Sequence, residues 1–414
     1  MSGVSRRRLL GAAGAGVALA GAGAAAAACS APATTPSPSD VVPFRGTHQA
    51  GIITPAQDRL HFAALDVIDG DRAALQSLFR KWTAAAERMT AGAEVTPGGA
   101  VNRNPDAPPD DNGEALGLPA SQLTITFGVG PGLFAKAGVD RFGLAAKRPA
   151  ELLDLPPFTL DDIDPALSGG DICIQACAND PQVAVHAVRH LARIGFGTTA
   201  VRWSQLGFGR TSSTSTTQAT PRNLFGFKDG TNNLKAEDPA GLDEHVWIKG
   251  GAQPWLEGGT YLVARRIRMH IEVWDRTSLN DQQLLVGRNK GEGAPLSGSK
   301  EFDLADYELK GEDGQPTIAL DAHIRLASAH ALGGVKILRR GYNFVDGSDG
   351  QGHLNAGLFF LAFMKDPAKQ FVPMQSALAN NDTMMEYIEH TSSAVFAVPP
   401  GLGEGTYWGQ SLIE

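Results

Sequence analysis

The chain has 414 residues, of which 43% are hydrophobic and 19% charged, and its formal net charge is −8. This length predicts a sizeable buried core and two domains of ordinary size. The negative charge disfavours phosphate backbones as partners, and the sequence has no basic run interleaved with aromatic residues. We therefore expect no binding to nucleic acid.

The first 29 residues have the composition of an export signal. Arg6, Arg7 and Arg8 precede a long uncharged stretch of mostly Ala and Gly. A basic start, an apolar stretch and a small-residue cleavage zone are typical of a signal peptide, and paired arginines predict the twin-arginine translocase as its export machinery. A transmembrane anchor is the alternative. Because the stretch is only weakly apolar and a linker-like segment follows, we expect a cleaved signal at residues 1–29, a linker at 30–49 and an exported protein.

The three cysteines differ in their surroundings. Cys29 follows three alanines, which weakly indicates a lipid anchor, although the usual leucine is missing. Cys173 and Cys177 lie in an apolar run that predicts a buried strand. Residues four apart on a strand are roughly 13 Å apart, whereas a disulfide needs Cα atoms within about 7 Å. We therefore expect two buried free thiols, as in a protein that folds in the reducing cytoplasm before export.

Elements in the first half follow the order of a ferredoxin-like unit. Apolar or alternating runs predict strands, helical spacing of apolar residues predicts helices, and a segment rich in Pro, Gly, Asp and Asn predicts a long loop. In chain order these are a strand at 59–68, a helix at 71–89, the loop at 95–117, strands at 123–127 and 171–177, a helix at 181–194 and a strand at 198–203. This β-α-β-β-α-β order predicts a first domain over residues 50–222.

The second half repeats this type without a residue-level repeat. A Ser/Thr-rich stretch at 210–221 separates the two sets. The expected elements are a long strand at 261–274, a helix at 281–286, strands at 322–326, 337–344 and 358–364, and a helix at 381–389. The predicted fold class is α+β, with two ferredoxin-like domains built on antiparallel sheets, residues 50–222 and 223–414.

Three short patterns contain the candidate functional residues. Asp229 stands in a Gly-x-x-Asp-Gly turn, whose glycines can accept dihedral angles that other residues avoid. His323 lies in the segment 322–326, and Arg339 and Arg340 lie in the segment 338–344. Each pattern alone is more often structural, since most Asp-Gly pairs are turns, most lone histidines are not ligands, and paired arginines usually mark a solvated edge.

In this order and spacing, the three patterns resemble the dye-decolourising (DyP-type) peroxidase family, and in particular its exported branch that includes the deferrochelatases. The segments 170–178 and 357–363 are similar to further family blocks, so that the resemblance extends from about residue 50 to the end of the chain. The resemblance implies one haem b per chain, bound in the second domain near the domain junction. It also implies that hydrogen peroxide is used to oxidise bulky aromatic or dye substrates. We further expect a homo-oligomer.

Carried over to matching positions, the resemblance implies that Asp229 is the distal acid, His323 the iron ligand and Arg339 the distal arginine. A neutral imidazole can donate a nitrogen lone pair to iron. An ionised carboxylate can move a proton between the two oxygens of peroxide, and a guanidinium can stabilise negative charge as their bond breaks. Arg340 is the competing residue, because successive strand residues face opposite ways.

The surroundings of the iron ligand are predicted less specifically. A ligating histidine usually donates its other N–H to an acceptor, and the resemblance favours Asp382 for this, with Glu386 as the alternative. Phe360 is expected to line the haem pocket, together with its neighbours Phe359 and Phe363. His186 and His190 stand four apart on a predicted helix, but no glutamate follows the first, so a zinc-peptidase site is not expected.

The same residues are compatible with two other functions. The protein could serve iron uptake beside a permease, by binding haem or by oxidising ferrous iron. It could also be a haem carrier without catalysis, although a carrier needs neither Asp229 nor Arg339.

Overall fold

The computed structural model describes residues 40–101, 104–251 and 253–414. The predicted signal peptide, Cys29 and residues 30–39 of the predicted linker lie outside this described part. Among the described residues, no helix is both long enough and apolar enough to cross a membrane.

The first half is a ferredoxin-like unit, as predicted. Its sheet has the strand order β4-β1-β3-β2, and the pairings are antiparallel. The predicted helices are confirmed within about one residue at each end, and the last strand continues beyond its predicted end to Arg210. The elements are β1 (Arg59–Val67), α1 (Arg72–Thr90), β2 (Thr124–Val129), α2 (Pro131–Phe134), β3 (Ile172–Ala178), α3 (Pro181–Ile194) and β4 (Thr199–Arg210).

The second half has the equivalent strand order, β10-β5-β8-β7, with two short strands added at its margins. These short strands are β6, which pairs with β8, and β9, which pairs with β5. The elements are α4 (Pro239–His245), β5 (Thr260–Met269), α5 (Ile271–Trp274), α6 (Leu279–Val286), α7 (His323–Leu326), β6 (Leu338–Arg339), β7 (Tyr342–Ser348), β8 (Leu354–Met364), α8 (Phe371–Asn381), β9 (Ile388–His390), β10 (Ala394–Val398) and α9 (Gln410–Ile413).

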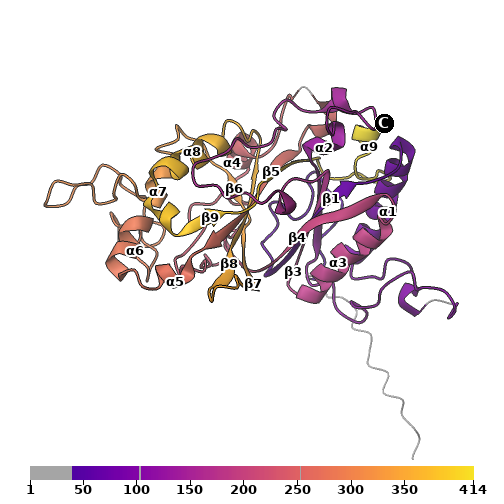
Figure 1. Cartoon of the computed structure of the whole chain (residues 1–414), viewed down its shortest axis with the longest axis horizontal. Helices are drawn as coiled ribbons and strands as arrows, with labels where there is room; N and C mark the ends of the chain where they lie inside the picture. The colour runs from indigo at the N-terminus through magenta and orange to yellow at the C-terminus, as the bar shows by residue number, and fades with distance from the viewer. Residues whose placement is uncertain (1–39, 102–103, 252) are drawn as a thin grey trace, which may run out of the picture. The chain divides into compact units, whose positions relative to one another are not determined.

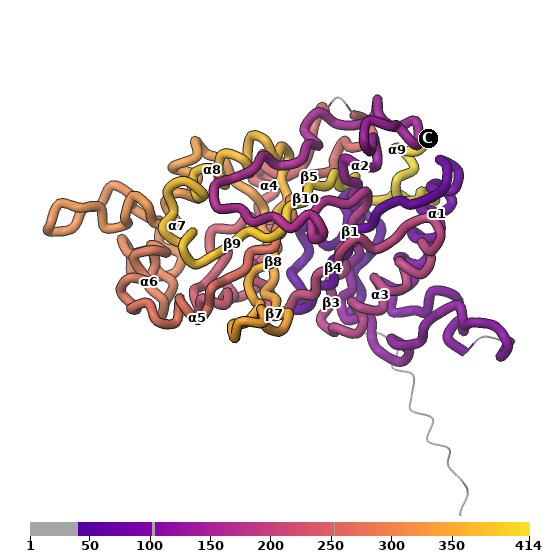
Figure 2. Tube along the Cα trace, viewed as in Figure 1, coloured from indigo at the N-terminus to yellow at the C-terminus, as the bar shows by residue number. Residues whose placement is uncertain are grey.

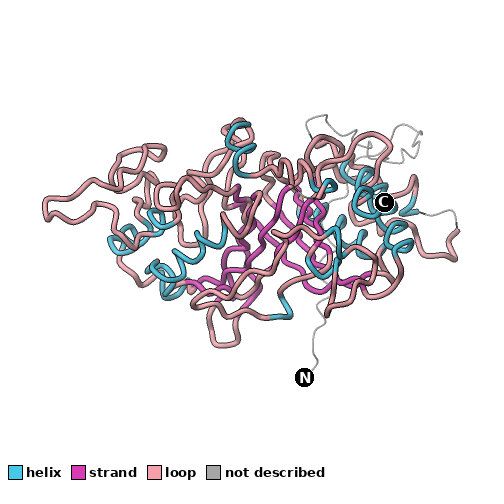
Figure 3. The backbone as a smooth tube through the Cα atoms, turned by 90° about the horizontal axis from the view of Figure 1, so that it is seen from above, coloured by secondary structure: helices cyan, strands magenta, loops and turns pink. Residues whose placement is uncertain are grey.

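The two half-sheets join into a closed ring of antiparallel strands. β2 pairs with β10 at one junction and β4 pairs with β7 at the other. Aromatic side chains fill the inside of the ring, where the Phe62 ring lies 5.2 Å from Trp203, 5.4 Å from Phe359 and 6.1 Å from Phe396. The strands therefore lie in the middle, with α1 and α3 on one side and α5 to α8 on the other (Figures 1, 2 and 3).

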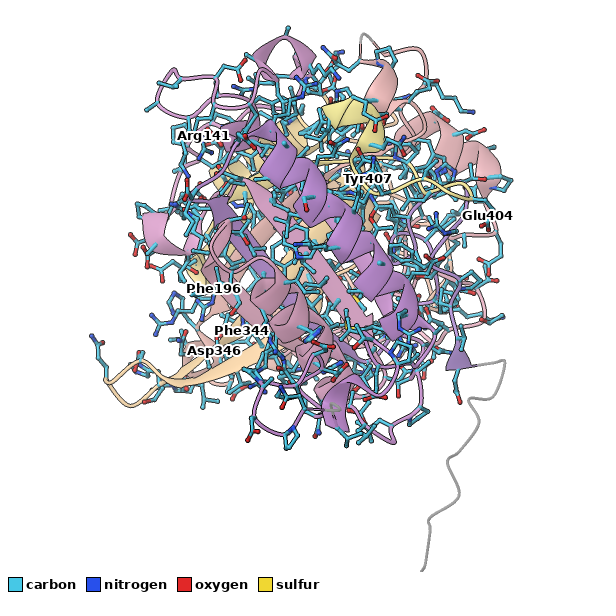
Figure 4. All side chains as sticks on the ribbon, turned by 90° about the vertical axis from the view of Figure 1, so that its right-hand side faces the viewer. Arg141, Phe196, Phe344, Asp346, Glu404 and Tyr407 are labelled. Atoms are coloured by element: carbon cyan, nitrogen blue, oxygen red, sulfur yellow. The ribbon has the colours of Figure 1, made fainter. Side chains whose placement is uncertain are left out.

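Helices α1 and α3 cover the outer face of the first half-sheet (Figure 4). Asp71 caps α1 by accepting a 2.8 Å hydrogen bond from the Ala74 N–H, which satisfies a free donor of the first turn. The Trp82 indole donates a 2.8 Å hydrogen bond to the Leu191 carbonyl and so links α1 to α3. The face of this half-sheet is thereby closed by a packed apolar layer.

Two predicted elements of the second half are wrong in type. Residues 322–326 form a helical turn, α7, and not a strand; the Ala327 N–H donates to the His323 carbonyl at 3.1 Å. The predicted helix at 381–389 is instead the end of α8, a 3₁₀ turn at Thr383–Glu386 and the strand β9. Both segments are short, and a few apolar positions fit a period of two as well as a period of 3.6.

Two predicted strands are interrupted. The long strand expected at 261–274 ends at Met269, and α5 follows. The strand expected at 337–344 is divided into β6 and β7 around Arg340 and Gly341. Cys173 and Cys177 lie in β3 as buried free thiols, which confirms that prediction.

Candidate active site

The cavity that contains the candidate residues lies between the outer face of the second half-sheet and the short helices that cover it. It contains about 1700 Å³ free of protein atoms, including its open mouth and the solvent there. Its apolar walls come from β5, β8 and the helices α6 to α8. They include Ile267, Val286, Leu358, Phe360, Met374 and Leu378.

Of the three phenylalanines expected in the wall, only Phe360 lines the cavity. Phe359 and Phe363 belong to the core inside the strand ring. The expectation for these two is therefore wrong, because side chains alternate between the two faces of β8.

His323 lines the cavity from the helical turn α7. Its Nδ1 lies 2.6 Å from Oδ2 of the buried Asp382, whose Oδ1 accepts a 2.9 Å hydrogen bond from the Met384 N–H. Burial alone would lower the pKa of His323, but the charge and hydrogen bond of Asp382 outweigh it and raise that pKa. Asp382, and not the exposed Glu386, is thus the carboxylate beside His323. The other ring nitrogen, Nε2, makes no hydrogen bond to any side chain or backbone group of the described residues.

Asp229 and Arg339 form an ion pair in the same cavity. Arg339 donates from NH1 to Asp229 Oδ1 at 2.7 Å, and the Asn223 amide donates to Asp229 Oδ2 at 3.2 Å. The turn that holds Asp229 requires Gly230, which has φ +81°. A Cβ atom at this position would also lie 2.9 Å from Ser212 Cα. The motif therefore fixes the direction of one carboxylate.

The two adjacent arginines face different surroundings. Arg340 is fully buried and does not line the cavity. Its guanidinium donates to the Thr54 carbonyl at 2.5 Å and to the Gln57 side chain. Of the two candidates, only Arg339 can therefore contact a molecule bound in the cavity.

Sequence reasoning missed Arg288 in the cavity wall. Arg288 NH1 donates to the carbonyls of Gly293 and Glu301 at 2.6 and 3.0 Å. No carboxylate lies within salt-bridge distance of Arg288 in the described part of the chain, so its charge is available to an anionic group. A single arginine after a helix gives no signal in a sequence, which explains the omission.

His186 and His190, the two histidines four apart on α3, do not form a metal site. His186 has Asp111 and Glu114 beside different ring nitrogens, at 3.6 and 3.4 Å. Carboxylates on opposite sides of one ring cannot converge on a single ion. Within residues 40–101, 104–251 and 253–414, no group of three or more His, Cys, Asp or Glu side chains is arranged to hold a metal ion.

Comparison with known proteins identifies the family to which this chain belongs. Residues 49–209 match the family description "Dyp-type peroxidase, N-terminal", and residues 220–403 match "Dyp-type peroxidase, C-terminal". The chain belongs to the Dyp-type peroxidase family. The resemblance seen in the sequence is thereby confirmed, and so is the fold class of two ferredoxin-like halves.

Individual relatives agree with this assignment. The deferrochelatase of Escherichia coli K12 is 38% identical over 381 residues, which cover 90% of this chain and 87% of the relative. An oxyferrous/water complex of DtpA from Streptomyces lividans is similar with a TM-score of 0.82 and 36% identity, over 90% of this chain and 98% of that one. A DyP-type peroxidase from Cellulomonas bogoriensis has a TM-score of 0.80 and 39% identity, over 90% and 98% of the two chains.

Membership in the family defines the general chemistry of this Dyp-type peroxidase. It is a haem enzyme that reacts with hydrogen peroxide and oxidises small organic substrates. The residues that line the cavity fit such a cofactor. Apolar walls suit the faces of the macrocycle, and an imidazole with a free nitrogen suits its iron.

Proposed function

We propose that His323 is the only protein ligand of the haem iron, and that Asp229 and Arg339 act together on hydrogen peroxide. The observation that supports this most directly is that the pairs His323–Asp382 and Asp229–Arg339 line one cavity. A carrier that only bound haem would need the first pair but not the second. Phe360 and Arg288 complete the proposed site, Phe360 as an apolar wall and Arg288 as a partner for a haem carboxylate.

Asp382 would hold His323 in one orientation. If the Nδ1–H of neutral His323 donates to Asp382, the ring carries its proton on Nδ1, and Nε2 keeps the lone pair that can bind iron. The charge of Asp382 would also increase the electron-donating power of the ring. When bound, haem supplies an iron centre that accepts two oxidising equivalents from peroxide and passes them on one electron at a time.

Asp229 would transfer a proton between the two oxygens of hydrogen peroxide. Its Oδ1 is held by the short bond from Arg339, whereas Oδ2 accepts only the longer bond from Asn223. Oδ2 is therefore the better placed atom to take a proton from one peroxide oxygen and return it to the other. The Arg339 guanidinium would stabilise the negative charge that develops as the oxygen–oxygen bond breaks.

The optical spectrum of the purified, haem-loaded protein tests the proposal. One equivalent of hydrogen peroxide should change the Soret band within seconds, and an added dye should restore the original spectrum while it is bleached. A protein that binds haem but whose spectrum does not respond to peroxide would be a carrier, and the proposal would be wrong.

A second candidate is the activity named by the Escherichia coli relative, the removal of iron from haem. This reaction would place the protein in iron uptake, beside a ferrous-iron permease. It predicts that bound haem is converted to iron-free porphyrin, which porphyrin fluorescence detects. A peroxidase would instead keep its haem intact through many turnovers.

We also propose that the protein is exported in folded form by the twin-arginine translocase and that it forms a homo-oligomer. The export proposal rests on Arg6, Arg7 and Arg8 and the weakly apolar stretch after them. Replacing these arginines by lysine should keep the protein in the cytoplasm, as fractionation would reveal.

Lipid attachment at Cys29 is a weaker proposal. If Cys29 carries a lipid, Cys29→Ser should release the protein from the membrane fraction.

A further inference from the structure

Asn233 makes an unusual set of contacts behind the proposed peroxide site. Its Oδ1 accepts a 2.7 Å hydrogen bond from the Arg339 N–H, and its Nδ2 donates a 2.8 Å hydrogen bond to the Arg339 carbonyl. The second N–H of the amide donates to the Ser213 carbonyl at 3.0 Å. Asn233 is buried, with 8% of its surface exposed, so these bonds are shielded from water.

The strand that carries Arg339 is short and lies at a margin of the second half-sheet. β6 consists of only Leu338 and Arg339, and its one neighbour in the sheet is β8. The Arg340 N–H donates to the Leu361 carbonyl of β8 at 2.8 Å. The N–H and carbonyl of Arg339 therefore point away from β8, to a side where no strand of the described residues pairs with them. The Asn233 side chain supplies the donor and the acceptor that a further strand would have supplied.

Asn233 also belongs to the segment that carries Asp229. The segment 229–233 contacts Arg339 twice, through the Asp229 carboxylate at the guanidinium and through Asn233 at the backbone. The turn between them is closed by a 3.1 Å hydrogen bond from the Asn233 N–H to the Gly230 carbonyl. Both ends of Arg339 are thus fixed relative to the carboxylate with which it acts.

We infer that Asn233 is a positioning residue that sets the register of Arg339 against Asp229 and so controls the reaction with peroxide. Asn233 acts through Arg339 and not on the substrate itself. This inference rests on the proposed roles of Asp229 and Arg339. Small displacements of a catalytic group can reduce a rate by about 100-fold, so the loss of two backbone anchors should be visible in kinetics.

The test uses the haem-loaded protein, four single variants and one double variant. Asn233→Ala removes all three bonds, and Asn233→Asp keeps the volume and the acceptor for the Arg339 N–H but loses both donors. Asn343→Ala is the matched control, because Asn343 is also buried, donates to a backbone carbonyl (Gly209, 3.0 Å) and lies outside the cavity wall. Arg339→Leu is the fourth variant, alone and combined with Asn233→Ala.

Three quantities are measured for each protein: haem content from the Soret band, the second-order rate constant with hydrogen peroxide, and the affinity of the ferric protein for fluoride, an anion that a nearby guanidinium stabilises. We expect Asn233→Ala to keep its haem, to react with peroxide about 10–100-fold more slowly and to bind fluoride more weakly. Asn233→Asp should fall between Asn233→Ala and the parent. Asn343→Ala should lose comparable stability, but its rate constant with peroxide and its fluoride affinity should equal those of the parent.

The double variant decides whether Asn233 acts through Arg339. If it does, Asn233→Ala should have no further effect in the Arg339→Leu background. A parent-like rate for Asn233→Ala, or a full additional loss in the double variant, would overturn the inference. Failure of the proposed function has a different signature, because Arg339→Leu alone would then react at the parent rate. If Asn233→Ala does not fold, the rate and fluoride affinity of Asn233→Asp decide in its place.

Discussion

The outer faces of the two half-sheets differ in what covers them. Over β1 to β4 lie two long helices, α1 with 19 residues and α3 with 14, whose apolar side chains fill the space above the sheet. Over β5 and β8 lie α5, α6, α7 and α8, with 4, 8, 4 and 11 residues. These short helices leave the cavity of the candidate site between themselves and the sheet.

The comparison separates fold from function in one molecule. The two halves have the same strand order, so the sheet itself does not determine where a ligand binds. A long amphipathic helix covers the face of a sheet continuously, whereas several short helices joined by loops leave room and supply polar side chains. His323, Asp382 and Arg288 all lie on or beside these short elements.

Removing the proposed iron ligand should have the largest effect. We expect His323→Ala to lose stable haem binding, because the His323 ring lies 2.6 Å from a carboxylate, whereas His390, the other histidine that lines the cavity among the described residues, lies 3.9 Å from Asp161. The Soret absorbance per protein measures this loss. His353→Ala, at an exposed position outside the cavity, is the control and should keep its haem. An unchanged spectrum for His323→Ala would show that His323 is not the iron ligand, and the proposed haem site in the second half would be wrong.

Substitution of Asp229 or Arg339 should reduce the rate of the reaction with peroxide and leave haem binding unchanged. Asp229→Asn should slow the reaction with peroxide by about 10²–10⁴-fold, the usual contribution of a positioned proton-transfer group, while haem remains bound. Arg339→Leu should impair the same step. Stopped-flow spectra give both rates. If Asp229→Asn reacts like the parent while Arg339→Leu is inactive, the arginine alone is essential.

Arg340 provides a contrast at the neighbouring position. Because Arg340 is buried and bonded to carbonyls of residues 52–55, Arg340→Leu should destabilise the fold without changing the peroxide rate of the folded protein. Thermal unfolding and stopped-flow measurement on the same sample separate the two effects. A slow peroxide reaction in this variant would mean that the two arginines act together.

The outer faces of the two half-sheets, one covered by a packed apolar layer and the other by the cavity, should respond differently when a side chain is truncated. Trp82→Ala, in the packed layer, should reduce the free energy of unfolding by about 3–5 kcal/mol and leave haem affinity unchanged. Leu378→Ala, in the cavity wall, should reduce it by less and should weaken haem binding. Denaturant unfolding followed by circular dichroism, and haem titration, measure the two quantities. Equal destabilisation by both variants would contradict the comparison.

The smallest effect is a pH dependence that one histidine in each half should produce. Burial lowers the pKa of His61 in β1 to about 4, and burial together with Arg265 lowers the pKa of His390 in β9 to about 3. An unfolded histidine titrates near pH ~6.5, so below that pH the unfolded chain binds more protons. Stability from these groups is complete above about pH 6.5 and is lost as the pH falls toward 4 and 3. Each should contribute a slope of up to about 1.4 kcal/mol per pH unit.

Urea unfolding between pH 7 and pH 4.5 measures this slope. His61→Gln should flatten it by up to the contribution of one proton, and the exposed His330→Gln should not. An identical slope in His61→Gln would show that His61 is not held neutral by the fold.

The sequence alone determined the first half almost completely. Its two main helices, with 19 and 14 residues, are long enough to show the period of their apolar positions. The motif around Asp229, with His323 and Arg339, also identified the family before any geometry was known. The helix signals are local, because each depends on residues within one helix, whereas the family was identified from the order and spacing of three patterns along the chain.

Only the tertiary structure decided how the second half is arranged around its cavity. It assigned His323 to a helical turn and revealed the contacts of Asn233 and Arg288. It also placed Asp382 beside the His323 ring and Arg339 in the cavity wall, the two residues that the sequence had favoured over Glu386 and Arg340. The pairs involved are far apart in the chain: 59 residues separate His323 from Asp382, and 106 separate Asn233 from Arg339. No local pattern encodes such contacts, because they form only when the strand ring has closed and the short helices have packed against it.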